Sequence, residues 1–180
     1  ALITITACDK GEDSVAVPVS GSEAGHDYVD LGLIDVTSHT GNDVVNNIRV
    51  DTIYTTTFYF ANCNIGANNP QDIGEYFAWG ETTPKEIYDM STYRWGDATA
   101  KKYTKYCVNA EFGTVVDGVT ELEPQDDAAS VVCGNVWRMP TEKEFKELWL
   151  GCSWKWTTDF NGSGETGLVG TSKINGKIIF

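Results

Sequence analysis

Aromatic side chains on turn-rich segments are the first residues of this 180-residue chain whose type and spacing suggest chemistry. Between residues 76 and 106 the sequence holds eight Tyr, Phe and Trp residues, a density well above the 12% average of the chain. Aromatic faces supply a large contact area with little loss of side-chain entropy, which suits sugar rings and protein surfaces. We expect Tyr88, Tyr93 and Trp95, which lie beside basic residues, to contact a ligand. The alternative is that such rings form the core of a fold with few regular elements.

Residues able to perform catalysis are sparse. The two histidines, His26 and His39, lie in Gly- or Ser-rich surroundings that favour neither a zinc site nor a Ser-His-Asp triad. Pairs of carboxylates can be chosen freely among 26 acidic residues, so no pair indicates a glycosidase. The sequence therefore predicts no enzyme activity, no cofactor and no required metal.

One cysteine has a distinct setting near the start of the chain. Residues 5–8, Ile-Thr-Ala-Cys, resemble a bacterial lipobox, in which small residues precede the cut and the exposed Cys8 receives a lipid. Acidic and small residues follow directly. We expect residues 1–7 to be the remnant of a signal peptide and residues 8–25 an acidic stalk in the bacterial cell envelope. The alternative is a first strand that contains a buried Cys8.

The other four cysteines are scattered: Cys63, Cys107, Cys133 and Cys152. An exported protein meets an oxidising environment, where four cysteines allow three disulfide pairings. Buried free thiols are the alternative, and the sequence does not decide between them.

Charge and composition exclude several classes of protein. The chain has 26 acidic and 13 basic residues, a formal net charge of -13 that repels polyanions and argues against nucleic acid as a partner. A hydrophobic content of 41% excludes disorder for the bulk of the chain. No apolar run reaches the roughly 18 to 20 residues of a membrane-spanning helix. Attachment to a membrane is expected through the lipid alone.

Several elements can be predicted from local patterns. Residues 52–60 are β-branched and aromatic and predict a strand, whereas residues 34–51 suggest an inserted loop. Thr141 with a Glu three residues later forms a capping box, which predicts a helix over residues 141–151. A shorter helix is expected near residues 124–129. The Asn-Gly pair at residues 175–176 predicts a hairpin turn before an apolar strand that the sequence leaves incomplete.

Five sequence blocks occur together in a fixed order and cover residues 26 to about 156. They are residues 27–33 (Asp-Tyr-Val-Asp-Leu-Gly-Leu), 61–67 (Ala-Asn-Cys-Asn-Ile-Gly-Ala), 74–81 (Gly-Glu-Tyr-Phe-Ala-Trp-Gly-Glu), 126–129 (Asp-Asp-Ala-Ala) and 137–141 (Trp-Arg-Met-Pro-Thr). Together these blocks resemble the Fibrobacter succinogenes major paralogous domain. That family is similar to the formylglycine-generating enzyme fold, a C-type-lectin-like arrangement. The resemblance implies an α+β domain over residues 26–180, with a mixed sheet, two helices and long ordered loops, truncated at the C-terminus.

The resemblance also implies roles for residues inside the blocks. Trp79 and Trp137 are expected in the core, and Glu81, Arg138 and Thr141 are expected to be structural. Glu75 and Glu81 are the candidate partners of the Arg138 guanidinium. Trp154 and Trp156 alternate along one strand and are also expected to be core residues.

The implied function is that of a non-catalytic, surface-exposed lipoprotein module for adhesion, which binds an extracellular glycan or protein. A structural module of a surface appendage, or of a larger multidomain protein, is the alternative. The redox-active Cys pair of formylglycine-generating enzymes has no visible counterpart, so a related oxidase activity is a less favoured alternative.

Overall fold

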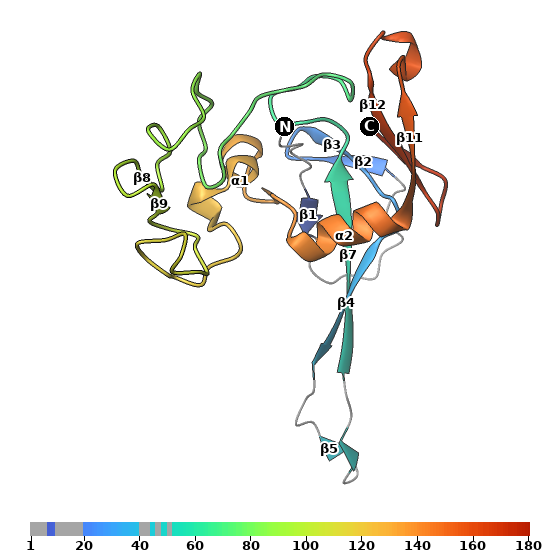
Figure 1. Ribbon diagram of the computed structural model, residues 1–180. Coiled ribbons are helices and arrows are strands. Elements are labelled where there is room, and N and C mark those ends of the chain that lie inside the picture. The colour runs from blue at the N-terminus through green and yellow to red at the C-terminus, as the bar shows by residue number, and fades with distance from the viewer. Residues whose placement is uncertain (1–6, 10–19, 40–43, 46–47, 50–51) are drawn as a thin grey trace.

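Strand β7 (Thr52–Ala61) organises the fold, as its β-branched and aromatic sequence predicts. The computed structural model describes residues 7–9, 20–39, 44–45, 48–49 and 52–180, with side chains for residues 21–34 and 57–180. β7 pairs with three strands: β1 (Ala7–Asp9), β3 (His26–Val29) and β4 (Ile34–His39). The strand order is β10-β1-β7-β3-β2, with β4 paired to β7 beside this path (Figure 1).

The remaining strands form the edges of this sheet and three smaller sheets. The edge strands are β2 (Ser20–Glu23) and β10 (Trp137–Arg138). Two of the smaller sheets have two strands each: β5 (Val44–Val45) with β6 (Ile48–Arg49), and β8 (Gly96–Asp97) with β9 (Lys102–Tyr103). The third contains β11 (Cys152–Thr157), β12 (Gly167–Ser172) and β13 (Ile178–Ile179). Every pair of named strands is antiparallel. The described residues therefore form an α+β fold with small antiparallel sheets, in place of the expected mixed sheet.

Alternation along β7 separates two clusters of buried residues within the described part of the chain. Tyr59 faces a cluster that includes Tyr28, Trp137 and residues of helix α1 (Ala128–Cys133). Its neighbours Phe58 and Phe60 belong to the second cluster. The other members of this cluster are Leu31, Leu33, Leu148, Cys152 and Ile179. Because successive side chains of a strand point to opposite faces, β7 supplies the middle of both clusters. Trp137 is fully buried, as expected.

Helix α2 (Glu142–Gly151) begins where the capping box predicts. The Thr141 side chain accepts a hydrogen bond from the Glu144 backbone N–H at 3.2 Å, and Glu144 accepts one from the Thr141 backbone N–H at 2.7 Å. Leu148 is fully buried against the sheet, while Phe145 and Trp149 of the same stripe are exposed. The predicted helix is confirmed, and its large apolar side chains are buried only in part.

The short helix expected near residue 124 is present as the 3-10 turn η1 (Pro124–Asp126) followed by α1. Asp127 caps α1 through hydrogen bonds that its carboxylate accepts from the backbone N–H groups of Ala129 and Ser130. The same carboxylate accepts the Met139 backbone N–H at 2.8 Å and so ties α1 to β10. Asp127 therefore has a structural role at the start of α1.

Residues 34–51 differ from the inserted loop that was expected. β4 pairs with β7 from Ile34↔Thr57 to His39↔Thr52, and Figure 1 shows this hairpin extending away from the other elements. The alternation of Ile34, Asp35, Val36 and Thr37 is typical of a strand and could have indicated it.

The N-terminal segment is also partly built into the sheet. β2 pairs with β3 through Ser20↔Val29 to Glu23↔His26, so residues 20–25, which the sequence assigned to the stalk, belong to a hairpin. The backbone of Cys8 lies in β1 and pairs with Tyr59 and Trp137. The other residues of the expected signal-peptide remnant and stalk, 1–6 and 10–19, lie outside the described residues.

The C-terminal strands form the hairpin that Asn175 and Gly176 predict. On β11 the expectation of two core tryptophans is wrong for Trp156, whose side chain is 59% exposed. Trp154 is half-buried and stacks on Trp149 of α2, with ring centroids 5.1 Å apart. The β11–β12 hairpin lies across the molecule from residues 85–125 (Figure 1).

Within the described residues, no helix combines the length and apolar character needed to cross a bilayer.

Candidate functional site

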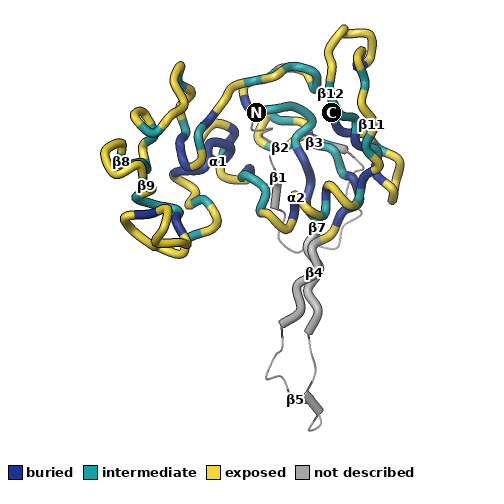
Figure 2. Tube along the Cα trace, viewed as in Figure 1, coloured by how far each residue is buried: buried dark blue, intermediate teal, exposed yellow. Residues whose placement is uncertain are grey.

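Ring hydroxyls fix the loop region, residues 76–123, where regular secondary structure is scarce. The Tyr88 hydroxyl donates to the backbone carbonyl of Tyr76 at 2.5 Å, and the Tyr93 hydroxyl donates to that of Trp79 at 2.8 Å. Figure 2 shows much of this region exposed, with buried residues where it meets α1. Since the bonds join segments more than ten residues apart, they hold the rings in place without helix or strand.

Trp95 connects two segments of the loop region, around Gly80 and around Tyr106. Its indole N–H donates to the Gly80 carbonyl at 2.8 Å, and its ring lies edge-to-face with Tyr106. Gly80 has φ +75°, and a Cβ at this position would lie 2.8 Å from the Trp95 indole nitrogen. Only glycine allows this approach without strain. Trp95, expected as a ligand contact, is thus half-buried and engaged by the protein.

A buried carboxylate next to the loop region, that of Asp126, contacts the segment around residues 105–106. Asp126, 2% exposed, accepts hydrogen bonds from the Lys105 ammonium at 2.7 Å and the Tyr106 hydroxyl at 2.8 Å, with the Arg94 guanidinium at 3.6 Å. Burial acts to raise the pKa of Asp126, but the hydrogen bonds from Lys105 and Tyr106 outweigh it and the pKa is lowered. Lys105 also pairs with Glu123, and these two carboxylates raise its pKa. The cluster remains charged at neutral pH.

Glu81 is a second buried carboxylate of the loop region, and a structural role is expected for it. Its carboxylate pairs with the Lys85 ammonium at 2.7 Å and accepts the Arg94 backbone N–H at 2.7 Å. The Lys85 nitrogen lies 5.5 Å from the ring centre of Tyr88 and 5.8 Å from that of Tyr93. Burial, helped by the charge of Glu81, raises the pKa of Tyr93 to about 12, so its hydroxyl keeps its proton at neutral pH.

The loop region contains a hollow of about 740 Å³, the aromatic cavity. Its volume falls in the range of roughly 300 to 1,000 Å³ that is typical of small-molecule sites. Its wall carries six exposed or half-buried rings: Tyr76, Trp79, Tyr88, Tyr93, Tyr103 and Tyr106. The polar side chains in the wall are Lys85, Asp89 and Lys105.

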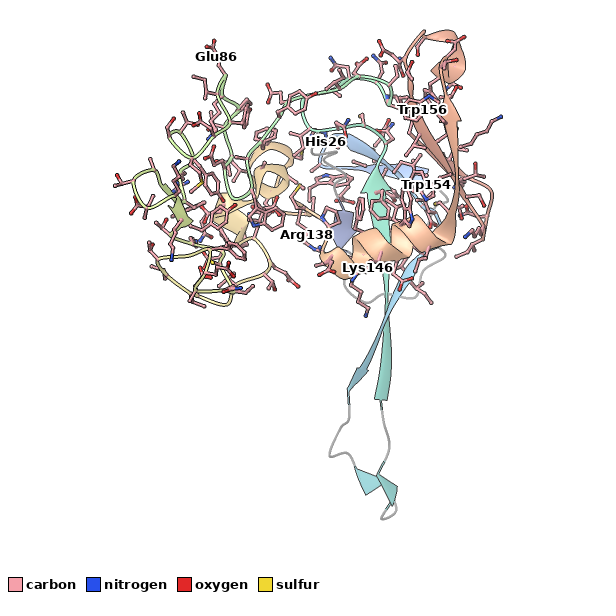
Figure 3. The ribbon with its side chains drawn as sticks, viewed as in Figure 1. His26, Glu86, Arg138, Lys146, Trp154 and Trp156 are labelled. Atoms are coloured by element: carbon pink, nitrogen blue, oxygen red, sulfur yellow. The ribbon has the colours of Figure 1, made fainter. Side chains whose placement is uncertain are left out.

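A second hollow of about 600 Å³, the mixed cavity, lies between the loop region and the start of α2. Trp79 belongs to its wall as well, together with Arg138 and Phe145. Figure 3 shows Arg138 between α1 and the first turn of α2. The two cavities are therefore neighbours that share the side chain of Trp79.

The structure brings some of the predicted contacts together and leaves others out. Tyr88 and Tyr93 line the aromatic cavity, whereas Trp95 is absent from the walls of both cavities. Trp79 was expected in the core and is 37% exposed in both walls. Tyr76 was not singled out by the sequence, although its position in a segment dense in Gly, Asn and Pro is compatible with a surface ring.

Arg138 has a different partner from the two that the resemblance suggested. Its guanidinium donates to both carboxylate oxygens of Glu144, at 2.8 and 2.5 Å, while Glu81 pairs with Lys85. The Arg138 side chain is 32% exposed. The capping box positions Glu144 for this pairing, because the same carboxylate also accepts the Thr141 backbone N–H.

Cysteine and histidine chemistry has little support in the described residues. Cys63, Cys107, Cys133 and Cys152 are free thiols, and burial raises the pKa of Cys63, Cys133 and Cys152. A raised pKa lowers the fraction of reactive thiolate. No group of three or more His, Cys, Asp or Glu within the described residues could hold a metal ion. His26 packs edge-on against Trp137, and the side chain of His39 lies outside the described residues.

Comparison with family models, with curated proteins and with solved structures finds no match for this chain.

Proposed function

We propose that this chain is a non-catalytic binding module of a bacterial cell-surface lipoprotein, which captures an extracellular glycan or protein in the aromatic cavity. The observation that carries the proposal is the gathering of exposed rings in one hollow. Tyr76, Trp79, Tyr88 and Tyr103 are each between 37% and 47% exposed and line the same cavity. Among the wall rings, Tyr88 and Tyr93 are held by hydrogen bonds from their own hydroxyls and so lose little entropy when a ligand covers them, which favours binding.

A C-type-lectin-like fold of the Fibrobacter succinogenes major paralogous domain is part of the same proposal. Its support is the ordered set of five sequence blocks, together with an α+β architecture of two helices and long loops. Two of the blocks meet at the candidate site: residues 74–81 contribute Trp79, and residues 137–141 contribute Arg138. This arrangement is compatible with a family in which loops present the ligand-binding face.

The non-catalytic role is supported by the chemistry of the cavity walls. Lys85 and Lys105 are both paired with carboxylates, and raised pKa values keep the ammonium of Lys105 and the hydroxyl of Tyr93 protonated. A general base or nucleophile needs a pKa near the working pH, and these groups are displaced from it. The walls therefore suit recognition better than proton transfer.

Lipid attachment at Cys8 is proposed from the lipobox-like residues 5–8. Processing at this point would remove Ala7, which pairs with Phe60 and Arg138 in β1, and would leave Cys8 as the first paired residue. Lipid labelling of whole cells that express the full-length protein tests the assignment. We expect label on the wild type and none on Cys8→Ala; label on both would contradict it.

A glycan array combined with a pull-down from cell-wall and host material tests the binding function. We expect the purified protein to retain a saccharide or a defined protein, and free ligand to compete for it. Concentration-dependent self-assembly in the absence of any ligand would contradict the proposal and support the structural alternative.

The structural alternative has one observation in its favour. Trp149, Leu150, Trp156 and Ile178 are each 45% or more exposed on α2, β11 and β13, away from both cavities. Exposed apolar side chains of this size can mark a contact between protein modules. Sedimentation of the wild type against Trp156→Ala decides this point, since a module that assembles through this surface would lose its assembly in the variant.

A further inference from the structure

The two cavities share one wall residue, and this suggests that they hold parts of one ligand. Trp79 lines both the aromatic cavity and the mixed cavity and is 37% exposed. Its backbone carbonyl accepts the Tyr93 hydroxyl, so the residue is fixed at its base while its ring faces remain accessible. A ligand long enough to leave the aromatic cavity past this ring would enter the mixed cavity.

The hydrogen-bonding state of the rings distinguishes between classes of ligand. Aromatic grooves can hold extended proline-rich peptides, and ring hydroxyls and indole N–H groups are suited to donate to the carbonyls of such a chain. Three of the six wall rings, Tyr88, Tyr93 and Tyr106, direct their hydroxyls to acceptors of the protein itself. These three rings therefore offer their faces rather than donors, which suits the apolar C–H faces of sugar rings.

The polar side chains at the cavity also suit hydroxyl groups. The Lys85 and Lys105 ammonium groups have three donors each and use two of them within the protein, and Asp89, which is exposed, presents an acceptor. Sugar hydroxyls both donate and accept, so they can use groups of both kinds, whereas peptide carbonyls only accept. In the mixed cavity the exposed side chains of Glu121 and Asn135 lie in the same wall as the Phe145 ring and repeat this combination.

Charge excludes acidic saccharides. The chain carries a formal net charge of -13, and the ammonium groups nearest the aromatic cavity are neutralised by Glu81, Glu123 and Asp126. No uncompensated positive group in the described wall is therefore available to hold a sulfate or carboxylate against this field.

We infer that the ligand is a neutral oligosaccharide that extends from the aromatic cavity, past Trp79, into the mixed cavity. This inference rests on the proposed binding function and adds the class of ligand and its length. The aromatic cavity, with more rings, is the primary subsite, and the Phe145 side of the mixed cavity contacts the sugars that follow.

Titration calorimetry with neutral oligosaccharides tests it, using cello-, manno- and xylo-oligosaccharides from disaccharide to hexasaccharide. For at least one series we expect the hexasaccharide to bind about tenfold more tightly than the disaccharide, a gain of about 1.4 kcal/mol. Phe145→Ala should bring this ratio close to one. Tyr76→Ala should weaken both ligands by a similar factor, and Trp156→Ala, an exposed aromatic side chain outside both cavities, should change neither.

Several results would overturn the inference. They are equal affinities along every series, a length dependence that survives Phe145→Ala, and selective binding of a sulfated saccharide or a proline-rich peptide included as competitors. A protein ligand captured in a Trp79-dependent manner would overturn the inference and leave the proposed function in place. Saccharide binding that is insensitive to both Tyr76→Ala and Trp79→Ala would overturn the two together. Thermal melts of each variant confirm that it is folded.

Discussion

Glu144 connects the sheet edge to helix α2 through three hydrogen bonds. Its buried carboxylate accepts two from the Arg138 guanidinium and one from the Thr141 backbone N–H. Burial acts to raise the pKa of Glu144, but the hydrogen bonds from Arg138 and Thr141 outweigh it and the pKa is lowered. Bidentate, charge-assisted pairs of this kind are stronger than neutral hydrogen bonds.

Arg138→Ala should lower the free energy of unfolding because it leaves the Glu144 carboxylate buried without its cation. A fully buried pair costs about 3 to 5 kcal/mol when broken. Arg138 is 32% exposed, so we expect about 1 to 3 kcal/mol. Urea denaturation measures the loss, with Lys146→Ala as the control because Lys146 forms an exposed pair with Glu142. Equal stability of the two variants would refute the structural role of Arg138.

Thr141→Ala removes the hydroxyl that accepts the Glu144 backbone N–H and should cost about 0.5 to 2 kcal/mol. Thr99→Ala is the matched control, because Thr99 is exposed. Its backbone N–H donates a hydrogen bond to the Asp97 carboxylate, and the substitution leaves that bond in place. Thermal unfolding of both variants checks the prediction. A loss in Thr99→Ala as large as that in Thr141→Ala would mean that the cap contributes nothing specific.

The two buried carboxylates with lowered pKa values predict how stability depends on pH. Asp126 and Glu144 have folded pKa values below their ordinary values of 3.8 and 4.5, so the unfolded chain binds protons first as the pH falls. Their contribution is complete above these values and is lost in more acidic solution. Melting temperature against pH should therefore fall more steeply below about pH 4.5 for the wild type than for Asp126→Asn. Glu111→Gln, at an exposed position, should keep the wild-type slope; a wild-type slope in Asp126→Asn would contradict the assignment.

Local elements could be predicted where the signal lies in adjacent residues. The capping box at Thr141, the strand ending at Ala61 and the turn at Asn175 each depend on a few neighbouring side chains, and each is present. The placement of Trp79 depends instead on a hydroxyl fourteen residues away in Tyr93, so no local pattern reveals it. The sequence could indicate that the loop region is ordered and aromatic, and not which rings face a ligand.

The hairpin of β4 and β7 extends away from the other elements (Figure 1), and none of its described residues lines either cavity. Asp35 pairs with Thr56, so residues 36–55 can be replaced by an Asn-Gly turn that continues the same register. We expect the melting temperature and ligand binding to stay unchanged, because the described core residues Leu33 and Phe58 lie on the retained side. Unfolding of the shortened protein, measured by circular dichroism, would contradict this. Loss of self-assembly alone would favour the structural alternative.

Across the whole molecule, acidic charge and the paired ammonium groups act together. The chain has a net charge of -13, and the two ammonium groups at the aromatic cavity are paired with carboxylates, Lys85 with Glu81 and Lys105 with Asp126. The aromatic cavity is left with ring faces and a few polar groups. An acidic chain with a site of this kind is what we expect for the neutral ligand proposed above.

The most direct test of this account compares two tryptophans in one binding measurement. Trp79 lines both cavities. Trp156 is exposed on β11, on the other side of the molecule from the loop region (Figure 3). Using the ligand recovered from the glycan array or pull-down, we expect Trp79→Ala to weaken binding at least about tenfold, or about 1.4 kcal/mol. Both variants should keep melting temperatures close to the wild type, and Trp156→Ala should keep its affinity. Unchanged affinity in Trp79→Ala, or a larger loss in Trp156→Ala, would contradict the assignment of the site.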